Sequence, residues 1–157
     1  LRDQASNQVI KSILVCGPEM RKDHRRAIHA LANECSSVQI LDFSEDMASL
    51  MEAADLVVCM GGYNTVCELL TLKKRAIIVP RTKPVQEQWI RADRLARKGV
   101  FRAIHPDQLT PQKLGSMVLE ELANTNVHSR LLYQVDMAGL DKIQESIGEL
   151  LKERGAS

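Results

Sequence analysis

Apolar residues along the chain form either short continuous runs or stripes at helical spacing. The short runs are rich in β-branched residues and predict strands at residues 12–16, 38–41, 55–60, 75–79 and 101–104. The stripes predict helices over residues 23–34, 47–51, 64–70, 85–98 and 110–122, and a last amphipathic segment over residues 140–151. Because strand and helix alternate, we expect an α/β fold, with a Rossmann-like parallel sheet and helices on both faces.

Several residues mark where these elements begin and end. Pro80 is expected to end the strand at residues 75–79, and Gly99 to end the helix at residues 85–98. Ser44 is expected to cap the short helix at residues 47–51. Thr110 followed by Pro111 predicts the start of another helix, because proline is favoured at the first helical position.

Residues 54–70 combine a buried strand, the Gly61-Gly62 break and the start of a helix that Asn64 or Thr65 can cap. The first amides of a helix suit a phosphate, and glycines let that phosphate approach the backbone. Glu68, one turn into the helix, can accept hydrogen bonds from sugar hydroxyls. Together these features describe a nucleotide site. The alternative is that the two glycines only make a tight turn between strand and helix.

Ligands of parallel sheets bind outside the carboxyl ends of the strands. The loops predicted at those ends are residues 17–19, 42–46, 60–64 and 80–88. We therefore expect four separate parts of the sequence to converge on one rim of the sheet and to form a ligand site there.

The composition is ordinary for a globular protein, with 45% hydrophobic and 26% charged residues among 157. This length fits one domain. Aromatic residues make up only 3%, and no recognition motif is present, so we do not expect nucleic-acid binding. The polar start, Leu1-Arg2-Asp3-Gln4, lacks an initiator Met and suggests a fragment of a longer protein.

The four cysteines and four histidines form no spacing typical of a zinc site, so we expect no metal and interpret the cysteines as reduced thiols of a cytoplasmic protein. Charge is distributed unevenly. Residues 73–102 contain ten Lys and Arg against two acidic residues, Glu87 and Asp93. Such a block is usually a solvated helix face, but it could also attract a polyanionic ligand or an anionic membrane surface.

These segments resemble a known family. Residues 54–100 read ADLVVCMGGYNTVCELLTLKKRAIIVPRTKPVQEQWIRADRLARKGV. This run is similar to the C-terminal domain of GT-B glycosyltransferases, and especially to the family 28 enzymes that include the lipid II-forming N-acetylglucosaminyltransferase. The upstream DFSEDMASLMEAADLVV and the downstream Leu109-Thr110-Pro111-Gln112-Lys113-Leu114 match further family segments. The resemblance covers roughly residues 13–122 and implies the C-terminal half of a GT-B fold.

The resemblance also implies roles for individual residues. Phe43 and Ser44 would lie against the base of the nucleotide. The diphosphate or the adjoining sugar would be approached by Gly61, Gly62, Asn64 and Thr65, while Glu68 would accept from the ribose hydroxyls. Glu87 and Gln88 stand where the family has paired glutamines that hold the donor sugar. Arg81 and Lys83 are candidate phosphate contacts.

Two positions depart from the family pattern. Glu87 replaces a glutamine, and Arg91 stands where the family often has asparagine. Both changes put the identity of the transferred sugar in doubt. Lys83 stands at a position often held by histidine, where a cation could still serve the phosphates.

The resemblance implies that the 157 residues are a single donor-binding domain of an inverting glycosyltransferase. A UDP-sugar is then the substrate, a hexosyl group is transferred, and no cofactor is required. The N-terminal acceptor domain, which supplies the catalytic base, would be a separate part, so no catalytic residue is expected here and the isolated domain should be inactive. Self-association through residues 140–151 and peripheral membrane contact of a cytoplasmic full-length protein are further expectations.

Two other functions stay open at this point. One is a non-catalytic module that completes a glycosyltransferase by docking on another chain. The other is a nucleotide-sugar epimerase of the same two-domain architecture, which fits Asn64–Leu69 less well.

Overall fold

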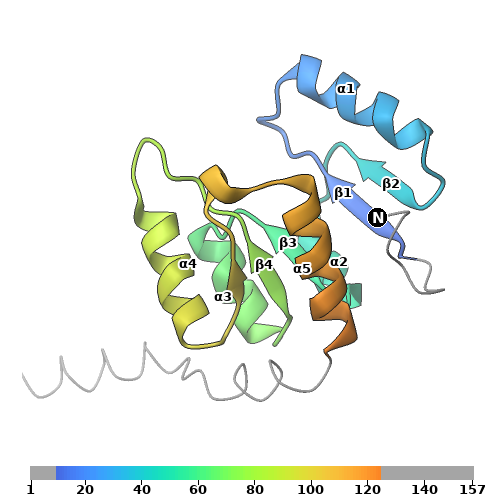
Figure 1. Cartoon of the computed structure of the whole chain (residues 1–157). Coiled ribbons are helices and arrows are strands. Elements are labelled where there is room, and N and C mark those ends of the chain that lie inside the picture. Colours follow the sequence, from blue (N-terminus) through green and yellow to red (C-terminus); the bar gives the residue numbers. More distant parts are fainter. Residues whose placement is uncertain (1–9, 125–157) are drawn as a thin grey trace, which may run out of the picture. The chain divides into compact units, whose positions relative to one another are not determined.

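The computed structural model describes residues 10–124, and Figure 1 shows their elements. The chain divides into two compact units, Leu1–Ala54 and Asp55–Ser157. The predicted amphipathic segment at residues 140–151 lies outside the described residues.

In the first unit, residues 10–54 form two strands and two helices. Their order is β1 (Ser12–Val15), α1 (Lys22–Asn33), β2 (Val38–Leu41) and α2 (Met47–Ala53). Strands β1 and β2 pair in parallel, with Ser12 opposite Val38 and Val15 opposite Leu41. This is the pairing expected when a helix connects two consecutive strands.

The second unit contains the remaining elements. Their order is β3 (Val57–Cys59), α3 (Tyr63–Thr71), β4 (Ala76–Ile78), α4 (Glu87–Arg97), β5 (Arg102–Ala103), the 3-10 helix η1 (Pro106–Gln108) and α5 (Pro111–Ala123). The strands form one parallel sheet in the order β3-β4-β5. The predicted α/β class with parallel strands is therefore confirmed.

Strand β4 is the centre of the second unit, and all three of its residues are buried. Ile77 packs in a cluster with Ile104 and with Met117 of α5. Successive strand residues point to opposite faces, so Ile78 faces away from this cluster. Figure 1 shows α5 in front of the strands and α3 behind them, so helices lie on both faces of this sheet.

The predicted helix starts are partly wrong. Asp46, not Ser44, caps α2, because the Asp46 side chain accepts from the Ser49 amide at 2.9 Å. The Ser44 hydroxyl instead accepts from the Asp46 amide at 3.2 Å. Helix α3 begins at Tyr63, after Gly62 and without a side-chain cap, so neither Asn64 nor Thr65 caps it.

Two other signals at helix ends are confirmed. The Thr110 side chain accepts from the Lys113 amide at 3.1 Å, with Pro111 at the start of α5. Gly99 adopts a φ of 69° just beyond α4, a conformation that glycine takes without strain. Among residues 10–124, no helix is long and apolar enough to cross a membrane.

Candidate functional site

The turn from β3 into α3 depends on Gly61. Its φ is +68°, in the left-handed region that favours glycine. A Cβ atom at this position would lie 2.5 Å from Cγ2 of Ile78, which is completely buried in β4. The second glycine is different, because a Cβ on Gly62 would meet only the Thr65 hydroxyl at 4.0 Å. Gly61 thus lets the backbone pass close over β4 at the carboxyl end of the sheet.

Cys59, at the end of β3, also takes part in this turn. Burial raises the pKa of the Cys59 thiol, and a hydrogen bond from the Gly61 backbone lowers it by less. The thiol therefore stays protonated at neutral pH.

We expect Cys59 to react slowly with iodoacetamide at pH 7.5. Alkylation requires the thiolate, and the raised pKa of Cys59 makes its thiolate scarcer at this pH than that of an ordinary cysteine. The measurement is peptide mass spectrometry over a time course, with Cys67 on α3 as the internal comparison. Cys59 labelling as fast as that of Cys67 would contradict the buried, protonated thiol.

The first turn of α3 offers backbone donors to a ligand. The earliest amides of a helix have no partner within it, and α3 has no side-chain cap to replace one. The Val66 amide is the first to bond back, to the Gly62 carbonyl at 2.9 Å. These amides and the positive end of the helix dipole favour an anion such as phosphate.

Asn64, Thr65 and Glu68 extend this surface along α3. They stand at positions i, i+1 and i+4, and the i, i+3 and i, i+4 relations place them side by side on the helix. Asn64 and Glu68 are exposed, and Thr65 is half-buried. The structure therefore brings these three predicted residues together with Gly61 and Gly62.

Residues of α4 connect to the same turn. The Gln88 side-chain oxygen accepts from the Arg81 amide at 3.1 Å, which joins α4 to the loop after β4. Glu87 forms an ion pair with Arg91, and Arg91 donates to the Gly61 carbonyl at 3.2 Å. Both predicted donor-sugar residues thus belong to hydrogen-bonded connections at the rim. Arg81 and Lys83 lie exposed on the loop.

Phe43 and Ser44 belong to the first unit, where they follow β2. Phe43 is 58% exposed. The preceding residue, Asp42, hydrogen-bonds His29 of α1 at 2.9 Å, which holds the pKa of the Asp42 carboxyl below its usual range. Since the two units are described separately, the predicted convergence of Phe43 and Ser44 with the glycine turn stays a prediction.

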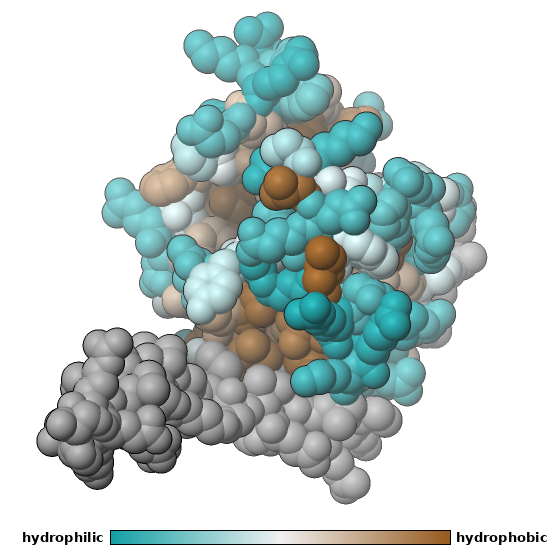
Figure 2. All heavy atoms as spheres, turned by 90° about the vertical axis from the view of Figure 1, so that its left-hand side faces the viewer, coloured by the Kyte–Doolittle hydropathy of each residue, from teal (hydrophilic) through white to brown (hydrophobic). Residues whose placement is uncertain are grey.

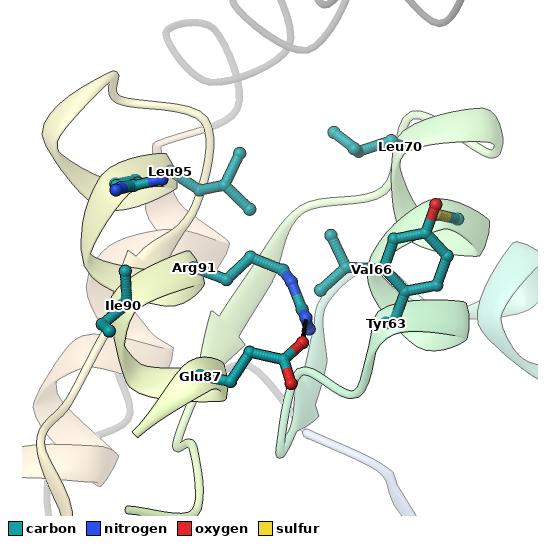
Figure 3. Close-up of a pocket in the computed structure, with 9 residues that line it drawn as sticks. Tyr63, Val66, Leu70, Glu87, Ile90, Arg91 and Leu95 are labelled. Carbon is teal, nitrogen blue, oxygen red and sulfur yellow. Dashed lines mark hydrogen bonds and ion pairs between the residues drawn. The ribbon is translucent and has the colours of Figure 1, made fainter. Parts of the chain in front are cut away.

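A groove with a volume of about 440 Å³ lies between α3 and α4 (Figure 3). It is lined by Tyr63, Val66, Cys67, Leu70, Glu87, Ile90, Arg91, Arg94 and Leu95. Of the residues predicted to bind donor, only Glu87 lines it. Figure 2, viewed with the left-hand side of Figure 1 toward the reader, shows apolar patches among the polar side chains.

Sequence reasoning missed the part that Arg91 and Tyr63 play. The Arg91 guanidinium lies 5.4 Å from the centre of the Tyr63 ring, a cation–π contact between α4 and α3. The i, i+4 spacing of Glu87 and Arg91 could have predicted their ion pair. No local pattern could have predicted the bond to Gly61, which is 30 residues away.

Residues 2–149 match the model of the glycosyltransferase family 28 C-terminal domain. A relative from Citrifermentans bemidjiense, "UDP-N-acetylglucosamine--N-acetylmuramyl-(pentapeptide) pyrophosphoryl-undecaprenol N-acetylglucosamine transferase", is 32% identical over 124 residues, covering 74% of this chain and 35% of the relative. A protein with the same description from Geobacter sp. is 31% identical, covering 74% and 33%. The chain spans about a third of the length of these curated relatives.

Solved structures agree in fold. MurG of Acinetobacter baumannii superposes with a TM-score of 0.69 at 22% identity, covering 94% of this chain and 51% of that one. The glycosyltransferase VinC, solved in complex with dTDP, superposes with a TM-score of 0.66 at 16% identity, covering 98% and 43%. At these identities the likeness concerns the fold.

Proposed function

The chain belongs to the glycosyltransferase family 28 C-terminal domain family, and we propose that it binds the nucleotide-sugar donor of a glycosyltransferase at the start of α3. The observation that carries this proposal is the uncapped start of α3 behind the Gly61 turn, with Glu68 one turn further on. The helix start receives the diphosphate, and the Glu68 carboxylate accepts from the ribose hydroxyls. The relatives named above, whose descriptions begin with UDP-N-acetylglucosamine, favour a UDP-sugar.

Other rim residues complete the proposed site. Gln88 already uses its oxygen to accept from the Arg81 amide, so its NH₂ group is the part that can donate to the sugar. Arg81 and Lys83 supply positive charge beside the diphosphate. Phe43 and Ser44 would contact the base.

In the full-length protein we propose inversion at the anomeric carbon of a hexosyl donor. A base outside this chain deprotonates the acceptor hydroxyl, which attacks the anomeric carbon as the bond to the diphosphate breaks. The amides at the start of α3 stabilise the negative charge that develops on the leaving diphosphate. The residues of this chain therefore bind and orient the donor.

Calorimetric titration of the 157-residue chain with UDP, ADP and GDP tests the proposal. We expect UDP to bind selectively and Glu68→Ala to weaken it about tenfold or more, because a hydrogen bond to a charged acceptor is worth roughly 1.5 kcal/mol or more. Glu52→Ala, which removes an exposed carboxylate from α2, is the matched control and should change nothing. Absence of UDP binding would overturn the proposal. Equal binding of UDP by Glu68→Ala and the unaltered chain would overturn the role of Glu68.

A further inference from the structure

Arg91 connects α4 to the glycine turn and to the start of α3. From α4, its Nη1 donates to the Gly61 carbonyl at 3.2 Å, while its Nη2 pairs with Glu87 Oε1. The guanidinium also lies over the Tyr63 ring, at 5.4 Å from its centre. The Arg91 side chain is only 21% exposed. Figure 3 shows it reaching from α4 across the mouth of the groove, with Glu87 beside the guanidinium and Tyr63 opposite.

Gly61 is consequently held by two different groups. It packs closely against Ile78, and its carbonyl accepts from Arg91. Since a trans peptide is planar, the Gly61 carbonyl and the Gly62 amide point in opposite directions. Fixing the carbonyl on Arg91 therefore also fixes the direction of the Gly62 amide.

The Gly62 amide is available to donate a hydrogen bond to a ligand. Within residues 10–124 it donates no hydrogen bond, and Gly62 is only partly buried. It directly precedes the first amides of α3, which also have no partner within the helix. These amides form one continuous row of donors.

We propose that Arg91 is a positioning residue for the diphosphate of the donor, acting through the Gly61–Gly62 peptide rather than by direct contact. This inference rests on the proposed function. Each terminal nitrogen of Arg91 already makes one contact, Nη1 with the Gly61 carbonyl and Nη2 with Glu87, and these two contacts hold the guanidinium at the turn. The Glu87 carboxylate offsets the charge of the guanidinium, so what Arg91 supplies is orientation. Without this bond, the peptide between two glycines loses one of the contacts that fix its direction, and glycine has little conformational preference to replace it.

The proposal also explains the two departures from the family pattern noted in the sequence. Glu87 and Arg91 form an ion pair one helical turn apart, so the two unusual residues act as one unit. Glu87 then positions Arg91, and Arg91 positions the turn. Glu87→Gln should weaken the arrangement less than loss of Arg91, because a neutral amide can still accept a hydrogen bond.

The test compares UDP with uridine, which lacks the diphosphate, by ligand-observed NMR on the 157-residue chain. We expect Arg91→Met to weaken UDP about tenfold and Glu87→Gln about threefold, while both leave uridine within twofold of the unaltered chain. Methionine retains the aliphatic contacts of Arg91 in the groove. The control is Arg94→Met on the same helix, which removes an exposed arginine that lines the same groove and should change neither ligand.

A second measurement does not depend on ligand. In ¹⁵N–¹H spectra of the free chain, Arg91→Met should shift or broaden the Gly61 and Gly62 amides, whereas Arg94→Met should not. If the signals of the Gly61 and Gly62 amides are the same in Arg91→Met as in the unaltered chain, Arg91 does not position the Gly61–Gly62 peptide. Equal weakening of UDP and uridine by Arg91→Met, or no weakening of either, would overturn its role toward the diphosphate. If the unaltered chain binds no UDP, the proposed function fails and this role fails with it.

Discussion

Gly61→Ala is expected to destabilise the second unit by about 3 kcal/mol. Two effects add at this position. A residue with a Cβ pays roughly 1 kcal/mol or more to hold a left-handed φ such as the observed +68°. The new methyl group would also lie 2.5 Å from Cγ2 of the fully buried Ile78, and overpacking a core costs about 1–3 kcal/mol. The measurement is urea denaturation followed by the fluorescence of Trp89, which belongs to this unit.

Gly62→Ala is the matched control for this prediction. Its φ is −55°, which any residue can adopt, and its added Cβ would have 4.0 Å of space to the nearest side-chain atom. Its cost should stay below about 1 kcal/mol, the typical effect of placing alanine at the residue before a helix. Equal losses in the two variants would mean that the close approach to Ile78 does not shape the turn.

The parts that sequence predicted well are those that local patterning determines. Strand β2 has the predicted bounds, and β1 ends one residue before the prediction. The glycine turn could be predicted because two adjacent glycines between an apolar run and an amphipathic run are typical of a tight turn between a strand and a helix. The pattern could not tell which glycine needs the left-handed conformation, because that depends on the distance to Ile78 in another strand.

The predicted helix starts were wrong where several neighbouring residues offered equivalent local signals. Gly62, Asn64 and Thr65 can all stand at the start of α3, and the close packing of the preceding Gly61 on β4 goes with a helix that begins at Tyr63. Ser44 and Asp46 are likewise both good caps, and α2 uses Asp46. Local sequence signals do not rank such candidates.

Contacts between distant elements were the least predictable from sequence. The bond from Arg91 to Gly61 joins α4 to the turn before α3 through a long side chain, and no spacing in the sequence indicates it. Helix α5 gives a second case. Its sequence predicts an apolar stripe of Leu114, Val118, Leu119 and Leu122, of which Leu114 and Val118 pack against the core, but the residues it buries most are Met117 and Glu121. A buried carboxylate is rare, so a hydrophobicity pattern assigns it to the surface.

Glu121 makes Arg102 the second position with a large expected effect. Arg102 Nη1 lies 3.3 Å from Glu121 Oε1, and the Glu121 side chain is only 3% exposed. Removing one partner of a buried ion pair typically costs about 3–5 kcal/mol, because the other charge is left in the interior. Arg102 is itself 36% exposed and Glu121 has further contacts, so we expect Arg102→Met to cost about 2–3 kcal/mol.

Two companion variants decide whether the buried pair is the cause. Arg102 also pairs with Glu120, with 3.2 Å between Nη2 and Oε2, and the Glu120 side chain is 56% exposed. Glu120→Gln therefore removes a solvated ion pair and should lower the free energy of unfolding by less than about 1 kcal/mol. Adding Glu121→Leu to Arg102→Met should recover much of the lost stability, because the carboxylate that lacks its arginine is then gone. All variants are measured by the same urea denaturation. If the double variant is no more stable than Arg102→Met alone, the loss of stability arises from the packing of the aliphatic part of the Arg102 side chain and not from the charge on Glu121.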